Sequence, residues 1–422
     1  MLNWANRFNI FCLLDNRHYL PTGIGIDKPA FECLLAAGAK TNIDLQAGNA
    51  FDALRCFYTA NKQEWLFGHL GYDLKNETEH LHSANEDGIG FSDLHFFVPE
   101  VVIELNDTAV SIHAAAGEAA TVYASILECP ATISQNEHAA IDIQHKIKKE
   151  TYISIVEKLR GHILRGDCYE INFCQEFFAT GATIDPLAVY NRLTALSPNP
   201  FSVLYKQHER FCLCASPERY LKKEGNNIIS QPIKGTSKRD LTNQEADEKA
   251  RNYLTASEKE KSENVMVVDL VRNDLSRICK PGTVQVDELF GVYSFPQVHQ
   301  MISTVSGEVD AGKDWIDCIE ATFPMGSMTG APKKKVMELI EEYEQSRRGL
   351  FSGAIGYVKP GGDLPDGQAG FDFNVVIRSM LYNAANQYLS FQAGGGITYN
   401  SEPEQEYEES LLKARAMMKV LE

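Results

Sequence analysis

One stretch organises the chain: Ile229-Ser230-Gln231-Pro232-Ile233-Lys234-Gly235-Thr236-Ser237-Lys238-Arg239. A short β-favouring run enters it after a turn at Gly225-Asn226-Asn227. Pro232 stiffens the backbone before the lysine, and Gly235 allows the backbone after it to pass close to another surface. The stretch therefore presents the Lys234 amine from a fixed backbone, or it forms a surface turn with a solvated lysine. The other motifs of the chain decide between these two interpretations.

Length and composition describe a large globular protein. The chain has 422 residues, of which 44% are hydrophobic and 23% charged, enough for a large core in one or more domains. The formal net charge of −17 argues against a general nucleic-acid or anionic-membrane surface, so we expect neither partner. The cysteines include no Cys-x-x-Cys pair, and the chain has no leader-like start and no run of about twenty apolar residues. We expect a cytoplasmic protein with reduced thiols.

Hydrophobic patterning divides the chain near the charged segment 145–150. Residues 1–145 are β-rich, and residues 146–422 mix helices and strands without strict βαβ alternation. The predicted helices are 152–163, 186–196, 243–271, 315–322, 332–344 and 403–421. The predicted strands include 8–14, 65–72, 96–105, 168–178, 201–205, 211–214, 283–289, 298–309, 351–358, 371–382 and 388–393. The mixture predicts an α+β fold with many antiparallel strands.

Two Glu-x-x-Glu pairs, Glu260/Glu263 and Glu406/Glu409, fall in predicted helices. A spacing of three residues puts both carboxylates of a pair on one helix face. If the two helices face each other, the four side chains form an all-oxygen site, which suits Mg²⁺ and not zinc. The alternative for each pair alone is a solvated helix face, because the chain has 57 acidic residues.

Four further features suit an anionic ligand. Glycines in the stretch 324–333 precede a predicted helix, where free N–H groups and the helix dipole bind a carboxylate or phosphate, unless the stretch is a plain capped turn. The triplet Gly394-Gly395-Gly396 allows close backbone approach, or forms a flexible loop. Arg378 lies inside an apolar run, either facing outward or buried and in need of an anion. Lys413 lies four residues after Glu409, so an intrahelical ion pair is its alternative.

In this order the motifs resemble those of the chorismate-utilising enzymes, the family of anthranilate synthase component I and aminodeoxychorismate synthase component I. The matching segments are 166–172, Ser216-Pro217-Glu218-Arg219, the lysine stretch, 263–275, 298–309, 323–333, 347–357, 373–379 and 394–416. They span about residues 150–422, and Gly71-Tyr72-Asp73-Leu74 adds a match near the N-terminus.

The resemblance implies a fold of two facing, mostly antiparallel β-sheets with helices packed outside. Residues 1–145 would be its N-terminal β-rich portion and 146–422 the chorismate-binding catalytic portion. It implies Mg²⁺ bound by the matching glutamates, which are Glu260, Glu263, Glu406 and Glu409. It implies that chorismate is held by residues matching His299, Thr329, Tyr357, Arg378, Gly394, Gly395, Gly396 and Lys413.

One position separates the branches of the family. Anthranilate, isochorismate and salicylate synthases usually have Ala at the place of Lys234, whereas Pro-Ile-Lys-Gly-Thr, here 232–236, resembles the aminodeoxychorismate synthases. In that branch the lysine is a covalent nucleophile, and Glu218 matches the general acid. We expect Glu218 to need a raised pKa and Lys234 a lowered one. Glu170 is a departure, because relatives often carry Gln there.

The resemblance therefore predicts Mg²⁺-dependent amination of chorismate at C4 to 4-amino-4-deoxychorismate, for 4-aminobenzoate and folate synthesis. No glutaminase nucleophile turn of the type Gly-x-Cys-x-Gly occurs, so ammonia would come from a separate glutamine amidotransferase subunit. Two alternatives remain: an anthranilate synthase component I, and a non-catalytic subunit that binds chorismate or tryptophan and regulates a partner.

Overall fold

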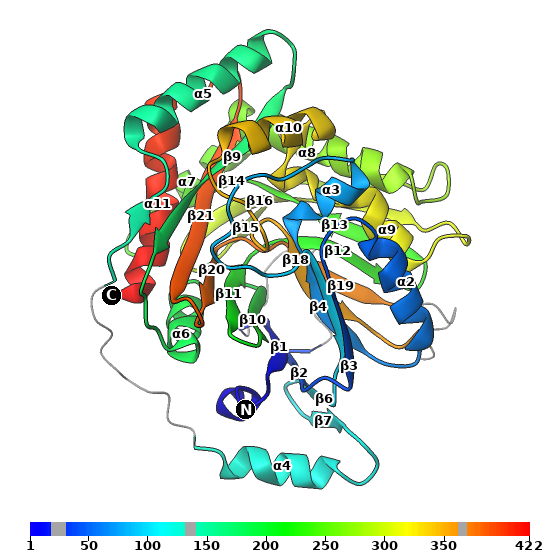
Figure 1. Cartoon of the computed structure of the whole chain (residues 1–422). Helices are drawn as coiled ribbons and strands as arrows, with labels where there is room; N and C mark the ends of the chain where they lie inside the picture. Colours follow the sequence, from blue (N-terminus) through cyan, green and yellow to red (C-terminus); the bar gives the residue numbers. More distant parts are fainter. Residues whose placement is uncertain (18–30, 131–140, 362–368) are drawn as a thin grey trace.

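The computed structural model describes residues 1–17, 31–130, 141–361 and 369–422. In these residues two large sheets, antiparallel throughout, pack face to face with helices outside (Figure 1). This confirms the expected α+β architecture. Both portions of the chain contribute to both sheets. Apart from the short strand Gln144–His145, the strands of 1–145 form one end of each sheet and those of 146–422 form the rest. The two portions join where Ile10–Asp15 pairs with Phe201–Gln207 and where Leu66–Leu70 pairs with Ala354–Val358.

The first sheet has the strand order β17 (Gly330–Ala331), β9 (Glu170–Ala179), β21 (Tyr388–Ile397), β20 (Ser379–Asn383), β11 (Arg210–Ser216), β10 (Phe201–Gln207), β1 (Ile10–Asp15), β2 (Cys33–Ala37), β6 (Val101–Leu105) and β7 (Val110–His113), with β8 (Gln144–His145) beside β9. The second has the order β14 (Ile233–Lys238), β16 (Val298–Glu308), β13 (Asn227–Gln231), β12 (Arg219–Glu224), β19 (Phe371–Asn374), β18 (Ala354–Val358), β4 (Leu66–Leu70), β5 (Leu94–Val98) and β3 (Thr41–Leu45), with β15 (Gln285–Ser294) beside β16.

The helices of the described residues are α1 (Leu2–Ala5), α2 (Ala50–Ala60), α3 (Lys75–Thr78), α4 (Ala119–Glu128), α5 (Lys149–Leu164), α6 (Pro186–Leu196), α7 (Gln244–Ala256), α8 (Glu258–Ser276), α9 (Trp315–Thr322), α10 (Lys333–Tyr343) and α11 (Pro403–Leu421), with 3-10 turns η1 (Tyr72–Leu74) and η2 (Gly326–Met328). Side-chain caps mark several starts. Asp185 accepts from two backbone N–H groups of α6, and Asp314 forms a reciprocal capping box with Asp317 at α9.

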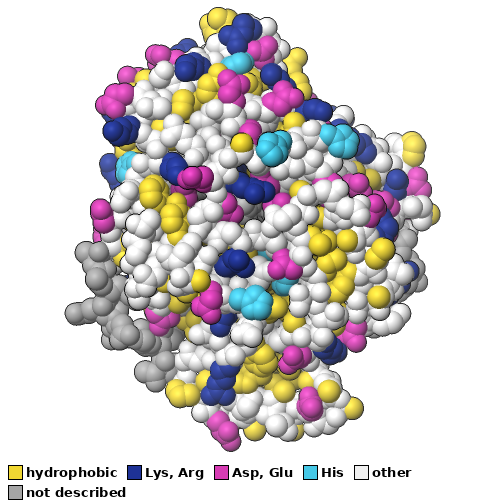
Figure 2. All heavy atoms as spheres, in the orientation of Figure 1, with side chains coloured by type: hydrophobic (Ala, Val, Ile, Leu, Met, Phe, Trp, Pro, Cys, Tyr) yellow, Lys and Arg dark blue, Asp and Glu magenta, His cyan; other side chains and the backbone are white. Residues whose placement is uncertain are grey.

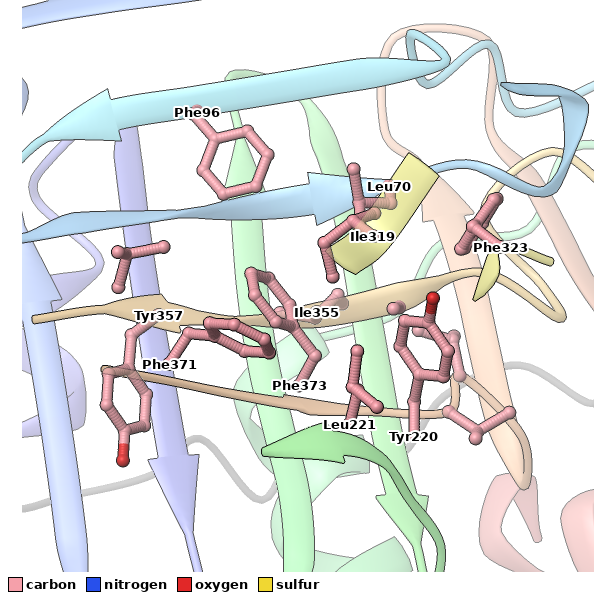
Figure 3. Packing of buried hydrophobic residues seen from close by; sticks show 14 of the residues in the cluster. Leu70, Phe96, Tyr220, Leu221, Ile319, Phe323, Ile355, Tyr357, Phe371 and Phe373 are labelled. Atoms are coloured by element: carbon pink, nitrogen blue, oxygen red, sulfur yellow. The ribbon is translucent and has the colours of Figure 1, made fainter. Parts of the chain in front are cut away.

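Alternation along the strands builds two cores. On β11, Cys212 and Cys214 belong to the cluster between the sheets, whereas Phe211 and Leu213 belong to the cluster under α6 and α11. Figure 3 shows the inter-sheet cluster around Phe373, where aromatic and aliphatic side chains of the second sheet meet α9. Because both faces of the first sheet are covered, its strands contain long apolar runs. All ten cysteines are unpaired, and none of the described helices is long and apolar enough to cross a membrane.

Several elements differ from the sequence prediction. The run 243–271 is two helices, because Ser257 interrupts it and caps α8 by accepting from the Glu260 backbone N–H. The run 371–382 is two strands, β19 and β20, and Arg378 lies in the irregular segment between them with φ of 50°. The run 96–105 also contains two strands, β5 and β6, which turn at Pro99-Glu100.

Candidate active site

The site lies where an edge of the second sheet meets the end of the first. Lys234 lies on β14, the edge strand of the second sheet, and not in a surface turn. Its Nζ donates to Glu170 Oε1 of β9 at 2.5 Å. Both side chains are largely buried, at 11% and 4% exposure. Gly235 has φ of 94° and interrupts the regular pairing of β14 with β16, as a glycine at a β-bulge does.

The glycine triplet forms the opposite wall of the site. Gly394, Gly395 and Gly396 belong to β21 and pair with β9, so they are strand residues rather than a loop. A Cβ on Gly396 would lie 2.4 Å from Glu170 Oε1 and 2.7 Å from Lys234 Nζ. A side chain there would therefore separate the lysine from the glutamate, which explains why this position needs glycine.

The predicted metal ligands lie on the two helices beside these strands. Glu260 of α8 lies beside Gly235, and Glu406 and Glu409 of α11 lie beside Gly395. Burial raises the pKa of Glu263 to about 7 and also raises the pKa values of Glu260 and Glu406. No group of three or more His, Cys, Asp or Glu side chains in the described residues converges closely enough to hold a metal ion.

Most of these carboxylates have no ion pair shorter than 4.0 Å within the described residues. Glu263 Oε1 is buried and accepts no hydrogen bond, and the nearest cation paired with it, Lys259 Nζ, is 4.0 Å away. Glu409 is the exception. Burial acts upward on its pKa, but Lys413, with Nζ 2.7 Å from Glu409 Oε1, outweighs burial and leaves that pKa below its ordinary value. The donor set consists of oxygen alone, so its chemistry fits Mg²⁺.

Glu218 occupies a buried position next to Lys234. Desolvation raises its pKa to about 7, against the opposing effects of Ser327, Lys234, the Ile233 backbone N–H and Arg378. This agrees with the raised pKa that we expected for a general acid. The neighbouring Arg219 fixes the strand, because its guanidinium donates to both oxygens of Asp372 at 3.0 Å and to Gln231 Oε1 at 2.7 Å.

Lys234 differs from expectation. Burial acts to lower its pKa, but the carboxylates of Glu170, Glu263 and Glu218 outweigh burial, so its pKa lies above the ordinary value. The expected lowering is therefore wrong for this state of the protein. The physical reason is that the pocket surrounds the amine with acidic groups, which stabilise the ammonium form.

Arg378 is a half-buried cation without a hydrogen-bonded anion among the described residues. Its guanidinium makes no hydrogen bond or ion pair with the described residues. Desolvation lowers its pKa to about 10, and the attraction of Glu218 only partly opposes this. Of the two alternatives for Arg378, the structure favours the guanidinium that needs an external anion.

Two further predicted residues lie close to the same strands. Lys413 Nζ donates to Gly394 O at 2.7 Å and also forms an ion pair with Glu409. Lys413 therefore makes both an intrahelical ion pair and a contact with the glycine wall. Thr329 lies between η2 and β17, and its carbonyl accepts from the Asn172 backbone N–H of β9. The Thr329 hydroxyl is buried and donates to Met325 O at 3.2 Å.

Two predicted substrate residues are engaged with groups other than Lys234. His299 Nε2 lies 3.1 Å from Asp247 Oδ1, and its Nδ1 lies 2.9 Å from the Ser294 hydroxyl, so the ring is engaged with α7 and β15. Tyr357 packs among Trp65, Phe67 and Phe31 in the inter-sheet core, and Figure 3 shows it at the far end of that cluster near Phe371. The substrate contacts expected of His299 and Tyr357 therefore stay predictions.

The structure also adds candidates that the motifs missed. Gln300 follows His299 and therefore faces the opposite side of β16, where it pairs with Thr236 of the lysine strand. Its amide oxygen is buried without a partner in the described residues. Glu170, which accepts from Lys234, is the second candidate. Its only signal in the sequence was that relatives often carry Gln at this position.

Comparison with known proteins now defines the class. A family model described as chorismate binding enzyme matches residues 11–419. The chain belongs to the chorismate binding enzymes, which confirms the resemblance.

Individual relatives carry two different names. Aminodeoxychorismate synthase component 1 of Bacillus subtilis is 33% identical over 374 residues, which cover 85% of this chain and 77% of the relative. Anthranilate synthase component 1 of Thermus thermophilus is 33% identical over 367 residues, with 85% and 77% covered. The crystal structure of anthranilate synthase component I from Streptococcus pneumoniae matches with a TM-score of 0.78 at 26% identity, covering 95% of this chain and 94% of that one. Overall sequence similarity therefore does not distinguish the two reactions, so the residues of the site must decide between them.

Proposed function

We propose that this chain is the chorismate-aminating component of an aminodeoxychorismate synthase. It converts chorismate and ammonia into 4-amino-4-deoxychorismate, which supplies 4-aminobenzoate and folate synthesis. The observation that carries the proposal is the Lys234 amine, held in a buried pocket between Glu170 and the glycine wall. An amine in this place is a nucleophile that the anthranilate branch, with its usual Ala, does not provide.

The reaction divides into two allylic displacements. The Lys234 amine forms a bond to C2 of chorismate, the ring double bonds shift, and the C4 hydroxyl leaves. Ammonia then forms a bond to C4, and the bond between C2 and the lysine nitrogen breaks. Hydroxide is a poor leaving group, so Glu218 gives it a proton, and water departs. The Glu218 pKa of about 7 suits this role near neutral pH.

Basic residues meet the charge of the substrate. Arg378 offers a guanidinium to one chorismate carboxylate, and Lys413, which contacts the backbone of the glycine wall, offers an ammonium to another. These groups resolve the conflict between an acidic protein, with a net charge of −17, and a dianionic substrate.

Magnesium fits the carboxylates on α8 and α11. The residues that would hold it are among Glu260, Glu263, Glu406 and Glu409. Within the described residues, Glu263 has a buried oxygen without a hydrogen-bond partner, and burial raises the pKa values of Glu260 and Glu406. When bound, Mg²⁺ supplies positive charge to a chorismate carboxylate. We expect Glu406→Gln to weaken the Mg²⁺ dependence of turnover at least tenfold in a titration, with the exposed Glu408→Gln on the same helix as the control. An unchanged titration would remove Glu406 from the metal site.

Ammonia would be delivered by a separate glutamine amidotransferase subunit. The name component 1 carried by the Bacillus relative supports a two-component enzyme. Free ammonium at alkaline pH should replace that subunit in the assays below.

Product identification tests the proposed function. The protein is incubated with chorismate, Mg²⁺ and ammonium, and the products are separated by liquid chromatography with mass detection. We expect aminodeoxychorismate, which an added lyase converts into 4-aminobenzoate. Fluorescent anthranilate with pyruvate would establish the anthranilate synthase alternative, which the equal identity to the Thermus relative keeps in view. No chorismate turnover at high ammonium would support a regulatory subunit.

Intact mass tests the covalent step. With chorismate and Mg²⁺ but no ammonia, quenching should trap an adduct on the wild-type protein and none on Lys234→Ala. Lys238→Ala is the matched control, because Lys238 lies on the same strand with its side chain exposed. If the adduct persists in Lys234→Ala, a different nucleophile is used.

A further inference from the structure

The lysine nucleophile has one carboxylate in direct contact. Among the described residues, the hydrogen bond and ion pair of Lys234 Nζ both go to Glu170 Oε1, at 2.5 Å. Glu263 and Glu218 act on the amine through charge alone, without a hydrogen bond to it. Glu170 is also only 3% exposed, so water does not compete strongly for its carboxylate.

Three strands fix this contact. Glu170 begins β9, where it pairs with Ala331 of β17 on one side, and the adjacent Ile171 pairs with Ile397 of β21 on the other. Gly396 leaves the space in which the two charged atoms meet. The pair is therefore positioned by backbone pairing and not by a flexible loop, as a proton-transfer pair requires.

The chemistry of the proposed function leaves one proton without an acceptor. An ammonium has no lone pair, so Lys234 must lose a proton before it forms a bond to C2. Glu218 cannot accept that proton, because it must itself be protonated to release the C4 hydroxyl. A second acid–base group must contact the amine, and Glu170 is the residue in that place.

We propose that Glu170 is a further catalytic residue: it holds Lys234 as the ammonium in the resting enzyme, accepts its proton for attack, and returns it at the end of the cycle. This role rests on the proposed function. In the first half, the proton moves from Nζ to the Glu170 carboxylate, the freed electron pair forms the bond to C2, and water leaves with the Glu218 proton. In the second half, ammonia forms a bond to C4, its excess proton goes to Glu218, the C2–N bond breaks, and Glu170 returns the proton to the lysine. The sum is chorismate and ammonia in, aminodeoxychorismate and water out.

Glu170→Gln distinguishes proton transfer by Glu170 from a role in which the side chain only positions Lys234. Glutamine keeps the length of the side chain and an oxygen that accepts from Lys234, but it cannot take a proton. The matched control is Glu176→Gln, the same change at a buried glutamate of the same strand, which accepts from Ser390 and Tyr388. Equal KM for chorismate and equal thermal unfolding of the variants would show that the pocket is intact.

The readout is the rate of adduct formation on Lys234, measured by rapid quenching and intact mass without ammonia. We expect Glu170→Gln to slow it on the order of a hundredfold at neutral pH, and Glu176→Gln to leave it unchanged. The rate of Glu170→Gln should then rise about tenfold per pH unit toward alkaline pH, because solvent must deprotonate the lysine. The charged groups that act on this amine are the same in both proteins: Glu263, Glu260, Glu218 and Glu409.

Two further results bear on the role. Glu170→Asp keeps a base, so it should retain the wild-type pH profile at a lower rate. In the Lys234→Ala background, adding Glu170→Gln should cost no further activity. An adduct rate within threefold of wild type and an unchanged pH profile in Glu170→Gln would overturn the assignment. If the wild-type protein forms neither adduct nor aminodeoxychorismate, the proposed function itself has failed, which is a distinct result.

Discussion

Arg378 shows at the scale of one residue how binding opposes stability. It combines a positive φ of 50° with a guanidinium that forms no ion pair or hydrogen bond to an anion in the described part of the chain. Both features cost free energy in the folded chain, which is a common property of functional positions. The lowering of its pKa to about 10 reflects lost hydration that the attraction of Glu218 only partly offsets.

We therefore predict opposite effects for Arg378→Met. The free energy of unfolding should rise by about 1–2 kcal/mol, because an unpaired, half-buried charge is removed. The KM for chorismate should rise at least tenfold, because a charged hydrogen-bond donor is lost. Denaturant unfolding and steady-state kinetics measure the two effects. Lower stability in the variant would mean that Arg378 has a structural partner instead.

Single residues also show what motif matching leaves open. His299 and Tyr357 lie in segments that match the family, yet the structure ties them to Asp247 and to the aromatic core. Side chains alternate along a strand, so an error of one position moves a residue to the other face. Sequence alone could not fix that register. Lys234 and Arg378 stood out because their charge contrasts with their rigid or apolar surroundings, whereas Glu218 was found only through the family match.

At the scale of the element, the three glycines of β21 serve different purposes. A Cβ on Gly394 would lie 1.9 Å from the Phe173 backbone oxygen of β9. A Cβ on Gly395 would meet only the ends of Glu406 and Glu409, at 3.3 and 3.6 Å, and Lys413 Nζ at 3.9 Å. The first glycine is needed for strand pairing, and the second leaves space among charged groups.

This difference predicts two contrasting variants. Gly394→Ala should destabilise the protein by more than 2 kcal/mol, because β21 must move away from β9. Gly395→Ala should change stability by less than about 1 kcal/mol and yet lower kcat/KM at least tenfold, since the methyl group occupies the site. Thermal unfolding and kinetics of the pair test this. Equal loss of stability in both would mean that the triplet is purely structural.

Periodicity predicted elements well where one signal dominated. The helices α9 and α11 and the capped α6 were predicted with the ends that the structure shows or within a residue of them. The predictions failed where one pattern spans two elements. Ser257 divides a helical run into α7 and α8, and residues 375–378 divide a β-favouring run into β19 and β20. Local propensity does not reveal such breaks, because tertiary contacts decide them.

At the scale of the molecule, the two sheets are joined by a buried polar contact as well as by packing. Tyr205 of the first sheet places its hydroxyl 3.1 Å from His69 Nδ1 and 2.6 Å from His95 Nδ1 of the second. Burial lowers the pKa of His69 to about 4 and also lowers that of His95. On the face that Figure 2 shows, acidic and basic side chains are interspersed, whereas His69 and His95 are buried inside the molecule.

The histidine contact predicts how the joined sheets respond to acid. Unfolded histidine binds a proton near pH 6.5, whereas folded His69 does so only near pH 4. Protons therefore favour the unfolded chain in this window, and the contribution of His69 is present above pH 6.5 and lost as pH falls toward 4. Between pH 6.5 and 5, we expect the stability advantage of wild type over His69→Gln to shrink by about 2 kcal/mol. Urea unfolding across this range measures it, with His82→Gln, an exposed histidine, as the control. Buried carboxylates such as Glu218 act in the opposite direction, so the difference between the two proteins is the quantity to compare. A constant difference would mean that His69 takes up its proton without unfolding the interface between the sheets.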